Sequence, residues 1–358
     1  MGKYDKDRFQ KELSIRFCLS RKMVPFLEVV TSSSADLSDN AEVLTDLDVA
    51  GVEIAGDGGL RWAFFDCKSG KMSAINRAFW AAGVKDYVDF DKAYVLLKNK
   101  PVHNQRLSAL TMNVDLHYED SFRELGTTND QAFADDLFYQ SSVDRWERVF
   151  DAYAKYSWSK ATFELARNSV PLTKTPWTTF RWIVAELRNV RGEYDPKKPE
   201  HKAIYLDLMA SAMVLWASLS RDIRRFYEPA MSKDEFEKIL RYYLWGGREN
   251  YEIRQKMKVL SGDGTGQADM PAWSKLIAYA GITVAAPNCV LECAHICREL
   301  SIRCLAEEND DFDKRIKLRM SENNRIRQFV SGMNGYLIDA GALPKDMAKT
   351  IDDLLFGF

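Results

Sequence analysis

The alternation of apolar and polar positions divides the chain into two parts. Up to about residue 125, short β-branched and aromatic runs alternate with runs of helical spacing. Beyond Gly126, helical periodicity continues to the end of the sequence with scarcely a strand candidate. We therefore predict an α+β domain over residues 1–125 and an all-helical domain over residues 126–358. A length of 358 residues also favours two domains.

The pattern within the first 125 residues predicts the element order αβββαβαβ. A helix that carries Phe9, Leu13 and Phe17 on one face precedes the strand-like run VPFLEVV. After a polar, turn-rich stretch, the runs VLTDLDVAGVEI and LRWAFFDCKS flank the sequence GDGG, which predicts a β-hairpin. The helix GKMSAINRAFWAAGV, the strand KAYVLLKN, the helix NQRLSALTMNV and the strand VDLHY complete the order.

Acidic and basic residues mark the two arms of this hairpin. Because side chains alternate along a strand, Asp46 and Asp48 share one face, and Asp66 and Lys68 share one face of the neighbouring strand. The two sets meet only if paired residue numbers sum to an even value, which requires a loop with an odd number of residues. A three-residue loop within residues 56–59, with a glycine in the left-handed position, meets this requirement.

Carboxylates this close together repel each other and lose hydration, so we expect a cation to neutralise them. Mg²⁺ or Mn²⁺ suits the site, because such an ion takes oxygen ligands and keeps waters that can be activated for attack on phosphorus. Lys68 would then orient that water or offset charge that develops on a phosphate. The alternative is a solvated hairpin whose acids and Lys68 form surface ion pairs, which are worth little.

An acid on the first hairpin strand and Asp-Cys-Lys on the second, in the order αβββαβαβ, resemble the PD-(D/E)XK nuclease superfamily, particularly its restriction-endonuclease-like and Holliday-junction-resolvase-like members. The resemblance covers about a third of the chain, and Leu47 stands where many members have proline. It implies a restriction-endonuclease-like fold with a mixed sheet, with Asp48 and Asp66 as metal ligands and Lys68 as the catalytic lysine. Glu12, on the first helix, matches an additional acid that some members use as a ligand or to orient water.

Two further basic residues follow the hairpin at the start of the next helix. Lys71 and Arg77 are expected to contact substrate phosphates on the basis of their charge and position. In the helical domain, basic runs around residues 221–225 and 315–327 are interpreted as solvated faces, with a groove for DNA phosphates as the alternative. Trp177, Trp182 and Trp245 have the spacing of a helical core, and no ligand is assigned to them.

Three cysteines of the helical domain, Cys289, Cys293 and Cys297, recur at every fourth position. On one helix the first and third would stand about 12 Å apart, too far for one zinc ion or small cluster, so we interpret them as buried apolar side chains. The charged N-terminus and the lack of an eighteen-residue apolar run predict a cytoplasmic protein with no membrane contact and reduced thiols.

A net charge of −2 and a pI near 6.2 give no long-range attraction to nucleic acid, so any contact with it must be local. Taken with the resemblance, the sequence predicts a Mg²⁺-dependent endonuclease that cuts DNA, in defence against foreign DNA or in repair. The helical domain would select substrate or bind a partner protein, and a homodimer would supply two sites for a double-strand cut. The alternative is a non-catalytic scaffold that binds nucleic acid or protein.

Overall fold

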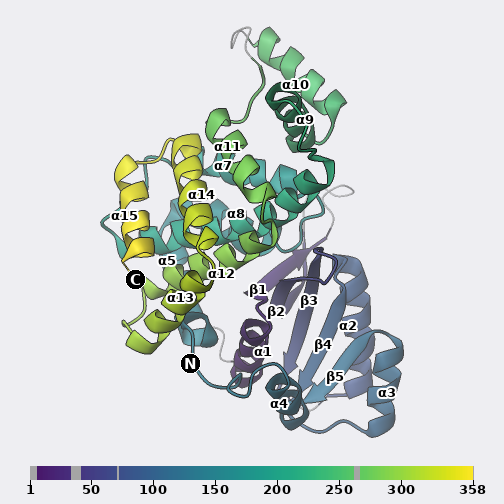
Figure 1. Cartoon of the computed structure of the whole chain (residues 1–358). Helices are drawn as coiled ribbons and strands as arrows, with labels where there is room; N and C mark the ends of the chain where they lie inside the picture. The colour runs from purple at the N-terminus through teal and green to yellow at the C-terminus, as the bar shows by residue number, and fades with distance from the viewer. Residues whose placement is uncertain (1–5, 34–41, 71, 262–266, 358) are drawn as a thin grey trace. The chain divides into compact units, whose positions relative to one another are not determined.

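The computed structural model describes residues 6–33, 42–70, 72–261 and 267–357 (Figure 1). The chain forms two compact units. The first comprises Met1–Asp151 and Leu305–Arg315, and the second comprises Ala152–Cys304 and Ile316–Phe358. The first unit therefore extends beyond the predicted limit at residue 125 and includes a segment from much later in the sequence.

The first unit follows the predicted order αβββαβαβ and then adds one more helix. Its elements are α1 (Arg8–Ser20), β1 (Val24–Ser32), β2 (Val43–Ile54), β3 (Leu60–Lys68), α2 (Ala74–Val88), β4 (Lys92–Leu97), α3 (His103–Thr111), β5 (Val114–Tyr118) and α4 (Glu119–Thr127). The five strands lie in the spatial order β1-β2-β3-β4-β5. The pairs β1/β2 and β2/β3 are antiparallel and the pairs β3/β4 and β4/β5 are parallel, so the sheet is mixed.

The predicted register and turn of the hairpin between β2 and β3 are confirmed. Val49 pairs with Phe65, and each later pair keeps the same even sum of residue numbers. Ala55 N donates to Gly59 O at 2.7 Å, which leaves three residues in the loop. Gly58 takes the left-handed position with φ of 78°, where a side chain would be strained.

Alternate residues of β3 face different helices, which places a helical layer on each face of the sheet. Phe65 contacts Phe17 of α1 with ring centroids 5.8 Å apart. Phe64, one residue earlier, contacts Trp80 of α2 at 6.4 Å. Accordingly α1 and α4 lie on one face of the sheet and α2 and α3 on the other (Figure 1). The residues that follow Phe65 in β3 therefore point alternately toward the two helical layers.

Beyond α4 the described residues are mostly helical, as the sequence predicted. A short 3-10 turn, η1 (Tyr139–Ser141), precedes α5 (Val143–Lys155). The helices that follow are α6 (Lys160–Glu164), α7 (Pro176–Asn189), α8 (Pro199–Phe226), α9 (Lys233–Leu244), α10 (Arg248–Leu260), α11 (Trp273–Val284), α12 (Asn288–Arg303), α13 (Asp310–Glu322), α14 (Arg325–Gly341) and α15 (Lys345–Phe356). A five-residue π-helical turn, Leu165–Ser169, follows α6. Proline is the first residue of α7 and of α8, where its missing N–H costs nothing.

Helix α8 forms the centre of the second unit. It is long and apolar enough to cross a membrane, but 94% of its most apolar window is buried inside the fold. Its Asp207 is fully buried and accepts hydrogen bonds from Arg167 at 2.8 Å and Tyr153 at 3.0 Å, while Arg298 lies 2.9 Å away. A single carboxylate thus forms ion pairs with two buried guanidinium groups in this core.

Two sets of side chains in the second unit test the predictions about its core. Cys293 and Cys297 are buried free thiols, in agreement with their interpretation as apolar side chains, whereas Cys289, also a free thiol, is partly exposed. The prediction that the tryptophans fill the core is wrong for Trp182, which is 54% exposed. Trp177 and Trp245 are only half-buried, and they line the groove described below.

Candidate active site

Of the residues predicted to meet on the hairpin, Asp48, Asp66 and Lys68 do so, whereas Asp46 is exposed. Lys68 Nζ lies 2.9 Å from Asp48 Oδ2 and 3.2 Å from Asp66 Oδ1. Asp48 lies in β2, and Asp66 and Lys68 lie at the end of β3. We call these three residues the acid hairpin. The confirmed register puts them on one face, because residues whose numbers continue the pairing sum stand opposite each other.

The side chain of Asp48 accepts a hydrogen bond from the backbone of β3 at the point where the pairing of β2 with β3 ends. Pairing of β2 with β3 ends at Val49, and beyond it Cys67 N donates to Asp48 Oδ2 at 2.8 Å. The side chain of Asp48 is 8% exposed. Burial raises the pKa of Asp48 above its usual value, Lys68 lowers it in part, and the carboxylate of Asp66 raises it again. Asp48 is therefore a carboxylate whose charge this environment disfavours.

Both carboxylate oxygens of Asp66 accept hydrogen bonds from Arg77, the residue that was expected to contact substrate phosphates. Arg77, in the first turn of α2, donates from Nε to Asp66 Oδ2 at 2.6 Å and from a terminal nitrogen to Oδ1. Its guanidinium lies over the ring of Trp80, 3.8 Å from the centroid. The structure thus places Arg77 on a carboxylate of the acid hairpin, because a forked donor matches two carboxylate oxygens as well as two phosphate oxygens.

Helix α1 contributes three residues that the sequence analysis missed. Asp7, Lys11 and Ser14 are spaced by four and three positions, so they share one face of the helix. Asp7 Oδ1 accepts hydrogen bonds from Ser69 N at 2.6 Å and Ser69 Oγ at 2.5 Å, and its Oδ2 lies 4.0 Å from Lys68 Nζ. The spacing was visible in the sequence, and it is the signal that would have identified them.

Lys11 links β1 to the acid hairpin. Its ammonium forms an ion pair with Glu28 of β1 and lies 3.5 Å from Asp48 Oδ1. Glu28 has φ of 55°, the left-handed region that a non-glycine residue adopts at a cost of roughly 1–3 kcal/mol. Burial raises the pKa of Glu28, and Lys11 lowers it in part. Strained backbone and a buried ion pair together sit beside the acids.

Glu12 does not reach the acid hairpin. Consecutive residues of a helix point about 100° apart, so Glu12 faces away from the acids that Lys11 contacts. Its carboxylate instead accepts a hydrogen bond from Val143 N at 3.1 Å, at the start of α5, and pairs with Arg8 and Arg16. The predicted role of Glu12 as a metal ligand is therefore not supported by its position. Lys71, the second expected phosphate contact, lies outside the described residues.

The donor set at the hairpin fits a hard cation in its chemistry. Four carboxylates and three cations gather there, which leaves one negative charge in excess; they are Asp7, Glu28, Asp48 and Asp66 with Lys11, Lys68 and Arg77. Within the described part of the chain, no three His, Cys, Asp or Glu side chains form a ready metal cluster. Two carboxylates are nevertheless enough for Mg²⁺, which retains several waters. An ion at Asp66 would compete with Arg77.

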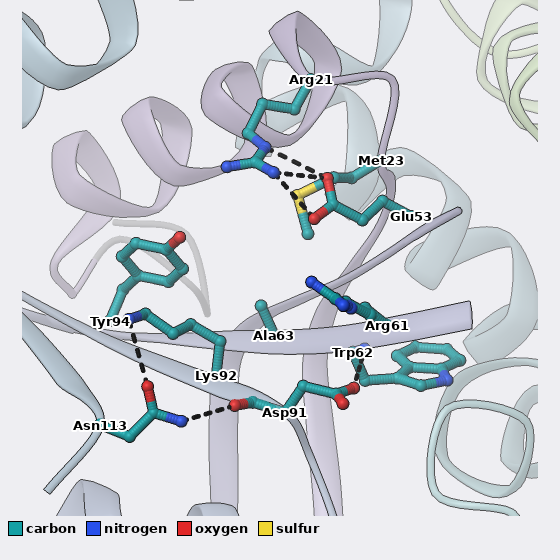
Figure 2. Close-up of a pocket in the computed structure, with 10 residues that line it drawn as sticks. All are labelled: Arg21, Met23, Glu53, Arg61, Trp62, Ala63, Asp91, Lys92, Tyr94 and Asn113. Carbon is teal, nitrogen blue, oxygen red and sulfur yellow. Dashed lines mark hydrogen bonds and ion pairs between the residues drawn. The ribbon is translucent and has the colours of Figure 1, made fainter. Parts of the chain in front are cut away.

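Two hollows flank β3 at its opposite ends. A cavity of about 250 Å³ adjoins the C-terminal end of β3 and is lined by residues that include Gly70, Ser73 and Lys100. A larger one, of about 410 Å³, lies at the N-terminal end beside Ala63 (Figure 2). Lys68 is five residues farther along β3, roughly 16 Å away. Substrate access to the acid hairpin therefore has to be sought at the smaller cavity.

Four of the charged residues that line the larger cavity have partners within the chain. Arg21 donates to both carboxylate oxygens of Glu53, at 2.8 and 3.1 Å (Figure 2). Asp91 Oδ2 accepts from Trp62 N at 2.8 Å (Figure 2), and Lys92 lies 3.0 Å from Asp115. Arg61, which also lines the cavity, is exposed and adds one positive charge to these internally paired groups.

No protein-family model, no curated protein and no solved structure matches the chain. The roles of Asp48, Asp66 and Lys68 are therefore inferred from the contacts given above.

Proposed function

We propose that the first unit is a restriction-endonuclease-like nuclease domain that hydrolyses phosphodiester bonds of DNA with Mg²⁺ or Mn²⁺. The observation that carries this proposal is the position of Lys68 Nζ, 2.9 Å from one buried carboxylate and 3.2 Å from a second. Gathering Asp48 and Asp66 around one lysine costs desolvation that a structural ion pair rarely recovers. Buried, mutually interacting charged groups of this kind cluster at functional sites.

Each residue of the acid hairpin has a role that its surroundings support. Asp48 and Asp66 would hold the metal ion, which, when bound, polarises a phosphoryl oxygen and lowers the pKa of a bound water. Burial lowers the pKa of Lys68, but the carboxylates of Asp66 and Asp48 raise it more, so the net shift is upward. Lys68 therefore stays charged at neutral pH. It would stabilise negative charge on the phosphate and would not act as a general base.

The test is cleavage of supercoiled plasmid by the full chain with Mg²⁺ or Mn²⁺. Asp66→Asn and Lys68→Ala should each reduce cutting by about 10³-fold, since each removes a group aimed at the reacting phosphate. Asp57→Asn is the matched control, because it removes one negative charge from the loop of the same hairpin and keeps an oxygen for Gly59 N. Cutting that survives both changes, or falls equally in the control, would contradict the proposal.

One observation favours a second candidate, a non-catalytic scaffold that binds nucleic acid or a partner protein. Arg77 occupies both oxygens of Asp66, and Lys11 and Lys68 neutralise Asp48, so the acids have internal partners without any metal. A scaffold would not need Mn²⁺. Calorimetric titration with Mn²⁺ separates the two candidates, because the nuclease should bind the ion through Asp48 and Asp66 and lose it in Asp66→Asn.

A further inference from the structure

The helical unit contains an open groove of about 490 Å³ at the junction of three segments. The segments are the start of α7, the turn that follows α9, and α10. We call it the arginine–tryptophan groove, and its lining comprises Thr175, Trp177, Thr178, Arg181, Trp245, Gly246, Asn250, Ile253, Arg254 and Met257. It draws residues from positions about 80 apart in the sequence, so no single sequence segment contains it.

Two arginines meet over one tryptophan ring at the base of this groove. The guanidinium carbons of Arg181 and Arg254 lie 4.6 and 5.4 Å from the ring centroid of Trp245. Arg181 is fixed by hydrogen bonds to Leu244 O at 2.9 Å and to Thr178 Oγ1 at 3.1 Å. A guanidinium has five N–H groups, so donors remain on both arginines after these contacts.

The two positive charges are not balanced by an acid in the described part of the chain. Two nearby arginines do have acidic partners: Arg241 of α9 lies 2.5 Å from Asp269, and Arg248 of α10 lies 2.6 Å from Glu252. Burial, and then the charge of Arg254, lower the pKa of Arg181. The two like charges repel each other, although Arg254 is exposed to solvent, and an anion bound between them would relieve this repulsion.

Apart from the arginines, the lining of the groove combines aromatic and apolar side chains with the polar Thr175, Thr178 and Asn250. Ile253 and Met257, one turn apart on α10, are 56% and 55% exposed, and no residue of α10 is fully buried. Gly246 has φ of 75°, and a Cβ there would stand 3.0 Å from Trp177 Nε1, so this turn needs glycine to bring Trp177 against it. A purely acidic peptide such as polyglutamate would satisfy the arginines but would leave the exposed Ile253 and Met257 without an apolar contact.

We propose that the arginine–tryptophan groove binds a single strand of nucleic acid, with phosphates on Arg181 and Arg254 and a base against Trp177, Ile253 and Met257. This inference rests on the proposed nuclease function, for which it names the form of the substrate. Single strands are bound where a positive groove carries aromatic side chains, because phosphates and exposed bases are then satisfied together. A duplex offers its phosphates without its base faces.

The test uses the full-length Asp66→Asn chain without divalent metal, so that binding is measured without cleavage. A labelled twelve-nucleotide oligo-dT is titrated by fluorescence anisotropy at several salt concentrations. Arg254→Ala should weaken binding by about tenfold and reduce the salt slope by about 0.7, the contribution of one phosphate on a single strand. Arg248→Ala is the matched control, because it removes an exposed arginine of the same helix that is already paired with Glu252.

The possible outcomes separate this inference from the proposed function. Equal binding by Arg254→Ala and by the parent chain would overturn the groove assignment, whether or not the wild-type chain cuts plasmid. Arg254-dependent binding in a chain that cuts nothing would uphold the groove and refute only the nuclease. Two results would show that the groove binds a polyanion other than a single strand. One is an equal loss of affinity for duplex DNA in Arg254→Ala, and the other is displacement of the oligonucleotide by polyglutamate at similar charge concentration.

Discussion

The acid hairpin and the arginine–tryptophan groove differ in whether their charged side chains have partners of opposite charge within the chain. At the hairpin, every acid has a cation from the chain within 4.0 Å. In the groove, two guanidiniums share a tryptophan ring and have no acid beside them among the described residues. A ligand of the hairpin must therefore displace an internal partner, whereas a ligand of the groove supplies the missing charge. Binding at the acid hairpin should therefore be limited by competition with the chain's own cations, and binding at the groove should weaken as the salt concentration rises.

The largest effect is expected from a change that tests whether the helical unit tolerates unbalanced arginines in general. Asp207 forms ion pairs with Arg167 and Arg298, and all three side chains are fully buried. Asp207→Asn should reduce the free energy of unfolding by roughly 3–5 kcal/mol, because it leaves buried charge without its counter-charge. Urea unfolding followed by far-UV circular dichroism measures the loss.

Asp353→Asn serves as the control for that experiment, since it makes the same chemical change at an exposed position in the same unit. Its effect should stay within about 0.5 kcal/mol. If Asp207→Asn were equally mild, unbalanced guanidiniums would be inexpensive in this unit. The open charges of Arg181 and Arg254 would then say little about a ligand, and the contrast with the acid hairpin would fail.

A smaller effect is expected at the acid hairpin, where Arg77 would compete with a metal ion for Asp66. Arg77→Gln removes the cation that holds both oxygens of Asp66. The affinity for Mn²⁺ should rise by about tenfold, which corresponds to about 1.4 kcal/mol, because the ion no longer competes with a guanidinium. Calorimetric titration measures the change, and Arg77→Lys, which keeps the charge without the fork, should give an intermediate affinity. An unchanged affinity in Arg77→Gln would show that Arg77 does not guard the site.

The two regions also differ in how far the sequence could predict them. The acid hairpin was predictable because strand alternation, an odd loop and the glycine at position 58 are local features. Arg77 was predicted to bind phosphate, but its charge alone could not tell a ligand oxygen from the oxygens of Asp66. Glu12 was preferred to Lys11 because an acid was sought on α1, although residues 7, 11 and 14 form the face that packs beside the hairpin.

The groove was missed because no local pattern contains it. Helical spacing predicted Trp177 and Trp245 as core, and spacing cannot distinguish a ring that is covered by other helices from a ring that lines a groove. Arg181 and Trp245 are 64 positions apart, and their contact depends on how α7 packs near the end of α9. The left-handed Gly246 was the one readable sign of a sharp turn there, but a turn does not reveal what it brings together.

The smallest expected effect separates stability from function at Asp48. Its raised pKa means that the folded chain holds the proton of Asp48 more tightly than the unfolded chain does. The charged form therefore costs stability at pH values above the folded pKa, and this cost disappears as the pH falls through the folded pKa to the usual value of 3.8.

Asp48→Asn should raise Tm at pH 7 by about 2–4 °C while it abolishes metal binding. Scanning calorimetry at a series of pH values measures this. The gain should shrink steadily toward pH 4, whereas a loss of stability at pH 7 would mean that Asp48 serves chiefly as the structural partner of Lys68.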